Sequence, residues 1–139
     1  MKQLGTDERL ALLRVTMGFI VFAAGLTKAF GGVYPHAEAL ALAGFPVALG
    51  FAWSIAIFEI IAGILLMLGL FVRPVAWLTA LLMASTYALI FSGRATASAL
   101  ITADPERLFL SAVLLVFALA VFFALQGPGK HSLDARLKN

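Results

Sequence analysis

The sequence predicts an all-α, membrane-embedded four-helix bundle with a short interfacial helix in the first outer loop. Three observations predict this fold. Hydrophobic residues make up 63% of the chain, and charged residues make up 12%, about half the share in a soluble domain. The mean hydropathy is +1.04. Four apolar stretches cover about residues 10–30, 51–72, 74–91 and 108–125, each long enough to cross a bilayer at about 1.5 Å per residue. Because they use most of the chain, we expect residues 1–139 to form a single transmembrane domain.

The first stretch, residues 10–30, has one face that combines charge with small size. Helical spacing of about 100° per residue puts Arg14, Gly18, Val21, Gly25 and Lys28 on this face. Glycines on a membrane helix allow the backbone of a neighbouring helix to approach closely. Since a charge at the bilayer centre costs about 2.5 to 3.5 kcal/mol, we expect this face to look into the bundle.

The first outer loop, residues 31–50, contains a helix signal of its own. Pro35 is expected to begin a short helix over residues 36–43, and Gly44 is expected to end it. Leu40 and Leu42 make this helix apolar enough to lie on the membrane or to cover the bundle. His36 at its start is predicted to be a solvated surface side chain rather than a ligand.

The second stretch, residues 51–72, carries one acid among small residues. Glu59 is flanked at helical spacing by small side chains, which are those of Ala52, Ala56, Ala62 and Gly63. This face should therefore also look inward. The connection to the third stretch, Val72-Arg73-Pro74, is very short, and proline suits the first turn of a helix. We therefore expect a tight antiparallel hairpin.

The last two stretches are less informative. Residues 74–91 contain hydroxyl groups at Thr79, Ser85, Thr86 and Tyr87, and such hydroxyls in membrane helices usually bond to their own backbone or to a neighbouring helix. Tyr87 lies at a depth similar to that of Glu59, so it is a candidate for the same site. The run Asp104-Pro105-Glu106 should begin the last helix.

The depth of each charge predicts which charges meet. Helical side chains lean toward the N-terminus of their own helix, so Lys28 leans into the membrane and Glu59 leans up toward the same level. We therefore predict a Lys28–Glu59 ion pair in the outer half of the bundle. Arg14 lies roughly 20 Å from Lys28 along the axis, so it should reach the cytoplasmic interface or the hairpin region of Arg73 rather than Glu59. The pair either fixes the register of the helices or belongs to a functional site, and both readings remain open.

Composition excludes several classes of chemistry. The chain has no cysteine, which rules out dithiol relays, iron–sulfur ligation and disulfides within it. Its two histidines, His36 and His131, lie outside the predicted spans, which rules out bis-histidine haem ligation within the bilayer. No metal site is predicted.

The distribution of basic residues predicts the orientation. Seven lysines and arginines lie on the side of the termini and three on the other side, out of the 10 in the chain. By the positive-inside rule, the N- and C-termini should face the cytoplasm. The net charge of +3 comes from residues beside the spans, so we expect no nucleic-acid partner.

Several segments resemble the DoxX family of membrane proteins. They are RVTMGFIVFAAGLTKAF, with Arg14 and Lys28, then FEIIAGILLMLGLFVRP, with Glu59 and Arg73, and the ending GPGKHSLDARL. The resemblance implies a small four-span protein of the bacterial inner (cytoplasmic) membrane. It also implies that Arg14, Lys28, Glu59 and Arg73 are polar positions shared with the family. Some members are named as subunits linked to quinone reduction with thiosulfate or to terminal oxidase complexes.

These observations lead to one preferred function and two alternatives. The preferred function is a quinone-associated or accessory subunit of a membrane redox system, with a quinone or small anion bound near Lys28, Glu59 and Tyr87. Quinone is the one cofactor considered, and the expected partners are the lipid bilayer, other membrane or redox subunits and a second copy of the chain. The first alternative is a non-catalytic structural or assembly protein, and the weaker one is a small-solute transporter. Whether the protein is an enzyme stays open.

Overall fold

The computed structural model describes residues 5–91 and 106–137, and this part of the chain is helical without strands. The helices are α1 (Thr6–Gly31), α2 (Val33–Leu42), α3 (Ala48–Leu68), α4 (Val72–Phe91), α6 (Glu106–Gln126) and α7 (Leu133–Arg136). The predicted all-α class is confirmed. The predicted start of the last helix at Asp104-Pro105 lies outside the described residues.

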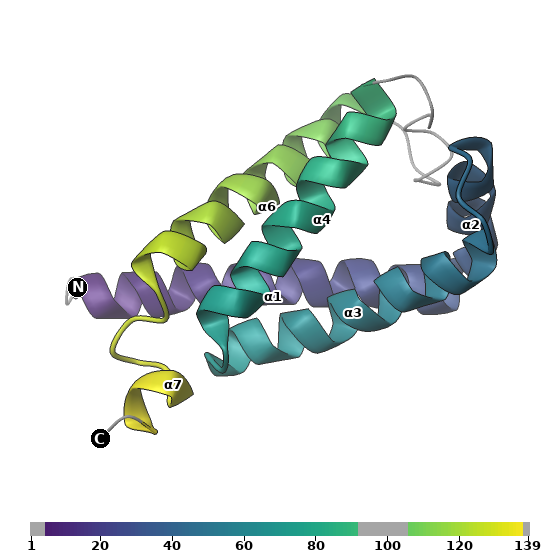
Figure 1. Cartoon of the computed structure of the whole chain (residues 1–139). Helices are drawn as coiled ribbons and strands as arrows, with labels where there is room; N and C mark the ends of the chain where they lie inside the picture. The colour runs from purple at the N-terminus through teal and green to yellow at the C-terminus, as the bar shows by residue number, and fades with distance from the viewer. Residues whose placement is uncertain (1–4, 92–105, 138–139) are drawn as a thin grey trace.

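The long helices pack as two antiparallel pairs, α1 with α3 and α4 with α6 (Figure 1). Figure 1 shows the pairs diverging from the end that holds the α3–α4 turn, α7 and both ends of the chain, which we call the turn end. The short helix α2 lies at the opposite end, the α2 end, where it packs mainly on α3. This arrangement brings the two pairs together at the turn end and leaves them apart at the α2 end.

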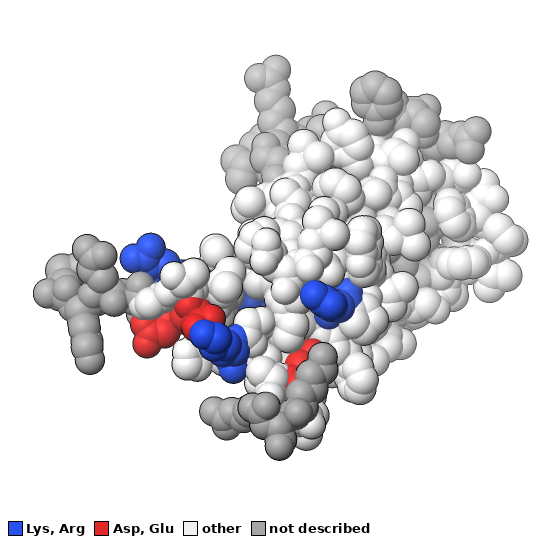
Figure 2. Space-filling model, turned by 60° about the vertical axis from the view of Figure 1, so that its left-hand side comes forward, with Lys and Arg blue, Asp and Glu red and all other residues white. Residues whose placement is uncertain are grey.

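The surface of the molecule suits a lipid environment. Helices α1 and α3 and residues Val72–Leu89 of α4 are each long and apolar enough to cross a membrane, and Ala112–Gln126 of α6 is a shorter apolar stretch. Large apolar side chains such as Phe19, Ile57 and Leu81 are 52–68% exposed. Figure 2 shows the charged side chains gathered at the turn end, beside a broad uncharged surface. The protein is therefore a membrane-embedded helical bundle.

Glycines hold α1 and α3 in close contact. A Cβ atom on Gly63 would lie 2.5 Å from the backbone nitrogen of Phe22 and 2.6 Å from the carbonyl oxygen of Gly18. A Cβ atom on Gly25 would lie 2.8 Å from the carbonyl oxygen of Ala56. The predicted inward faces of both helices are confirmed, since Gly18, Val21 and Gly25 are buried against the small residues of α3.

Two helix boundaries differ from the sequence-based expectation. Helix α2 begins at Val33 instead of residue 36, because Pro35 falls within its first turn, where no backbone N–H is needed. Helix α3 ends at Leu68 instead of Val72, because Gly69 adopts a left-handed conformation with φ 73° that terminates it. Arg73 and Pro74 therefore lie in the first turn of α4 and not in the connection.

The C-terminal segment, residues 127–137, folds back onto the α3–α4 turn. The Asp134 carboxylate accepts hydrogen bonds from the backbone N–H groups of Phe71 at 2.9 Å and Val72 at 3.0 Å. Its own N–H donates to the Gly69 carbonyl at 3.0 Å. Phe71 has a positive φ of 49°, which is uncommon for a residue with a side chain. Asp134 thus caps the start of α4 from a distant part of the chain and stabilises a strained turn.

Replacing Asp134 by alanine should lower the free energy of unfolding by about 1 to 2 kcal/mol, the cost of losing a helix cap. The measurement is reversible unfolding in mixed detergent micelles. Glu38→Ala is the control, since Glu38 is exposed on α2 and its loss should change stability by less than about 0.5 kcal/mol. Equal stability of the Asp134→Ala variant and the unmodified protein would contradict the capping role.

Candidate functional site

A cavity of about 450 Å³ lies between the two helix pairs at the α2 end, and we call it the central cavity. Residues from α1, α2, α3, α4 and α6 line it. Most are apolar, among them Ile20, Ile55, Leu82, Met83 and Val116. The volume falls within the range of small-molecule sites, about 300 to 1,000 Å³, and an apolar wall with few polar groups is typical of them.

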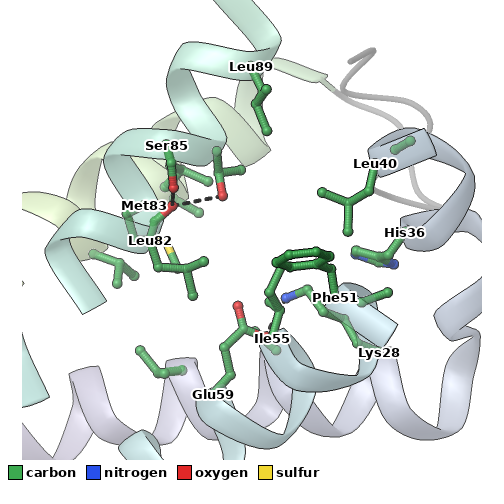
Figure 3. A pocket seen from close by; sticks show the side chains of 18 of the residues that line it. Lys28, His36, Leu40, Phe51, Ile55, Glu59, Leu82, Met83, Ser85 and Leu89 are labelled. Carbon is green, nitrogen blue, oxygen red and sulfur yellow. Dashed lines mark hydrogen bonds and ion pairs between the residues drawn. The ribbon is translucent and has the colours of Figure 1, made fainter. Parts of the chain in front are cut away.

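The predicted ion pair lies in the wall of the central cavity. Lys28 Nζ is 2.5 Å from Glu59 Oε2, and the two side chains are 17% and 3% exposed. Lys28 comes from the last turn of α1 and Glu59 from the middle of α3. Figure 3 shows both side chains reaching the cavity from below, next to the ring of Phe51. The pairing is confirmed, and it puts one cation and one anion in contact with an otherwise apolar space.

His36 also lines the central cavity, which the sequence reading missed. Figure 3 shows it reaching in from α2, near Lys28 and Phe51. Its Nδ1 atom is buried and has no hydrogen bond of normal geometry. Burial lowers the pKa of His36 below its usual value, the positive charge of Lys28 lowers it further, and the Gly32 carbonyl acts in the opposite direction. The two larger effects favour the neutral form of the imidazole.

A sequence signal for His36 did exist. Val33, Ala37 and Leu40, which are all buried, share one helical face, and His36 lies three residues after the first and four before the last. Treating the short helix as a cover over the bundle would have put His36 beside this buried face. The solvated surface position predicted for it is wrong.

The hydroxyl residues of α4 divide between the cavity and the core. Ser85 and Thr86 line the central cavity, and each donates its hydroxyl hydrogen to the Leu82 carbonyl at 2.9 Å, with the Leu81 carbonyl a second acceptor for Ser85 at 3.0 Å. Tyr87 is not among the described lining residues. It packs half-buried against the core formed mainly by α4 and α6. The structure therefore brings Ser85 and Thr86, instead of Tyr87, to the space beside Lys28 and Glu59.

Arg14 and Arg73 lie at the turn end, away from the central cavity. Arg14 is 2% exposed, and its guanidinium donates to the carbonyl oxygens of Pro128 and, at 2.8 Å, His131. Arg73 Nη2 donates to the Leu125 carbonyl at 3.4 Å. As predicted, Arg14 does not reach Glu59. Both arginines contact the C-terminal part of the chain, so they serve the fold at this end.

Groups of three or more His, Cys, Asp or Glu side chains that could hold a metal ion are not found among the described residues. The polar groups that line the central cavity are instead one ammonium, one carboxylate, one imidazole and two hydroxyls. Such a set hydrogen-bonds the polar head of an organic molecule whose remainder packs on the apolar wall.

Comparison with known proteins identifies one similarity. The family model described as DoxX matches residues 9–92, which contain Arg14, Lys28, His36, Glu59, Arg73 and Tyr87. Neither a curated protein nor a solved structure matches the chain. The match spans more than half of the 139 residues and includes the helices that supply Lys28 and Glu59.

Proposed function

The chain belongs to the DoxX family, and on that premise we propose that this membrane protein binds a quinone in its central cavity, as an accessory subunit of a membrane redox system. The observation that carries the proposal is an ion pair between the half-buried Lys28 and the buried Glu59, in the wall of an apolar cavity between membrane-spanning helices. Charges in such positions are rare in membrane helices and usually serve a function.

The Lys28 ammonium and the apolar wall of the cavity fit the head group of a quinone. The Lys28 ammonium has three N–H donors, of which one points at Glu59 Oε2, so the others remain for a quinone carbonyl oxygen. The aromatic ring would pack against Ile55, Leu82 and Met83. A lipid-soluble ligand also agrees with a cavity that lies inside a membrane bundle.

A partner protein supplies the electrons in this proposal. The chain has no cysteine, so any thiol or iron–sulfur chemistry belongs to other subunits of the system. Lys28 then binds the quinone, Glu59 holds the Lys28 ammonium in place, and Glu59 can exchange a proton with a bound oxygen. We further propose that the turn end faces the cytoplasm of a bacterial inner membrane, since the basic residues Arg9, Arg14, Arg73 and Lys130 belong to that end of the described chain.

Extraction of bound quinone from the purified full-length protein tests the proposal. The unmodified protein should yield quinone in amounts approaching one per chain. A Glu59→Gln variant should yield at least about fivefold less, because a neutral amide lets the Lys28 ammonium turn away from the cavity. Glu38→Gln is the matched control, since Glu38 is exposed on α2 and outside the described lining, and it should retain the quinone of the unmodified protein.

Two results together would overturn this function. They are an absence of quinone in extracts of the unmodified protein and normal respiration in a strain that carries only the Glu59→Gln variant. Because the loss of one charge could impair folding, the Lys28→Met/Glu59→Leu double variant is extracted as well. It has no unpaired charge in the cavity, and it should fold but contain no quinone.

A structural role is the second candidate, and the ion pair itself favours it. The pair joins α1 to α3 next to the glycine contacts, so it could serve only to fix the register of these helices. Exchanging the charges, with Lys28→Glu and Glu59→Lys in one chain, distinguishes the two roles. Recovery of both stability and respiration in this variant would favour the structural role, whereas a stable but quinone-free protein favours binding.

A further inference from the structure

The polar groups in the central cavity are mostly hydrogen-bond acceptors. Glu59 is a carboxylate and only accepts hydrogen bonds. Ser85 and Thr86 already donate their hydroxyl hydrogens to backbone carbonyls of α4, so what they offer a ligand is oxygen lone pairs. Among the described lining residues, Lys28 is the one side chain that can donate hydrogen bonds but cannot accept them. Its pair with Glu59 does not use all of its N–H groups.

His36 adds to the acceptor side. A neutral imidazole carries one N–H and one nitrogen lone pair. The positive charge of Lys28 opposes a second proton on the ring. The Nδ1 atom is buried without a hydrogen bond of normal geometry, so a lone pair on it is left for a ligand that donates a hydrogen bond. A buried polar atom that lacks a hydrogen bond is stabilised when a ligand supplies the missing partner.

We propose that the central cavity recognises the reduced, hydroxyl-bearing form of its ligand, a quinol, and that His36 accepts a hydrogen bond from one of its hydroxyl groups. This inference rests on the proposed quinone site and specifies its redox preference. A quinone offers only carbonyl acceptors, which Lys28 can satisfy but Glu59, Ser85 and Thr86 cannot. A quinol offers two hydroxyl donors, and a site built to bond a hydroxyl discriminates against the analogue that lacks it.

The preference has a consequence for electron transfer. A site that binds the reduced form more tightly makes reduction of the bound quinone more favourable than reduction of the free quinone. For a two-electron couple, a tenfold preference raises the midpoint potential of the bound quinone by about 30 mV. The protein would thus favour acceptance of electrons from its partner subunit.

The test compares duroquinone with its reduced form, durohydroquinone, as probes of the full-length protein in lipid nanodiscs. The dissociation constant of each is measured by calorimetry, under argon for the reduced form. The unmodified protein should bind the reduced form at least about tenfold more tightly. His36→Phe should reduce this ratio at least about threefold while the constant for duroquinone changes less than twofold, and His36→Gln, whose amide oxygen accepts, should restore part of the ratio.

His131→Phe is the matched control, because His131 is exposed at the turn end, and it should leave the ratio unchanged. Imidazole nitrogen resonances give a second readout, since durohydroquinone should shift the His36 signal and duroquinone should not. Equal affinities for the two forms in the unmodified protein would overturn the quinol preference and leave the quinone site intact. A parallel loss of both affinities in His36→Phe would assign His36 to the fold. Binding of neither form would overturn the site itself.

Discussion

Replacing Gly63 by alanine should separate α1 from α3 and lower the free energy of unfolding by about 3 kcal/mol. The added Cβ atom would lie 2.5 Å from the Phe22 nitrogen and 2.6 Å from the Gly18 oxygen. Both atoms belong to backbone, which cannot turn aside as a flexible side chain can. Overpacking of a core typically costs about 1 to 3 kcal/mol, and a clash with two backbone atoms belongs at the upper end. Unfolding in mixed micelles measures the loss.

Gly31→Ala is the matched control for this prediction. Gly31 is the last residue of α1, and a Cβ atom there would meet nothing within 4 Å. Alanine is also the better helix former, so this change should leave stability unchanged or raise it by up to about 1 kcal/mol. If Gly63→Ala proved as harmless as Gly31→Ala, the close backbone contact between α1 and α3 would be refuted.

Replacing Lys28 by methionine should cost about 3 to 5 kcal/mol, the usual result when one partner of a buried ion pair is removed. The Glu59 side chain is 3% exposed, so its charge would remain among apolar groups without the ammonium. The double variant Lys28→Met/Glu59→Leu should recover most of the lost stability, because it leaves no buried charge. The unfolding free energies of the two single variants and the double variant form a cycle that isolates the coupling between the side chains.

Lys130→Met is the control for the loss of a lysine. Lys130 pairs with Asp7 at 3.4 Å, but its side chain is 84% exposed, and exposed pairs contribute little. Its loss should change the stability by less than about 0.5 kcal/mol. A Lys28→Met variant as stable as Lys130→Met would mean that the pair with Glu59 contributes nothing to the fold. The quinone proposal would then depend on the extraction experiment alone.

Both predictions concern features that the sequence anticipated. The inward faces of α1 and α3 follow from helical spacing, and the meeting of Lys28 with Glu59 follows from their depths and from the lean of helical side chains. The sequence-based predictions failed where the surroundings of a side chain depended on which other helix packs against it. They left His36 in solvent, because the local pattern places His36 beside an apolar face but does not tell whether that face covers the bundle or lies on the membrane. They offered Tyr87 as a candidate for the site from depth alone, whereas Ser85 and Thr86 are the hydroxyl residues of α4 that line the cavity.

The C-terminal segment illustrates the same limit. The sequence placed Arg14 at the turn end, but it contained no sign that Pro128 and His131 supply the carbonyl oxygens that surround its guanidinium. Nor did it indicate that Asp134 caps α4, because a cap from 62 residues away leaves no pattern beside the helix. Such contacts depend on where the chain returns after α6.

The sequence by itself determined the helices, their apolar surfaces and the two charges that meet inside the bundle. These are properties of single helices, and residue spacing and the cost of charge in lipid decide them. Only the tertiary structure decided that the two helix pairs diverge, that a cavity lies between them and that His36 completes its wall. The angle between packed helices depends on how the surfaces of distant segments fit together, which a local pattern does not contain.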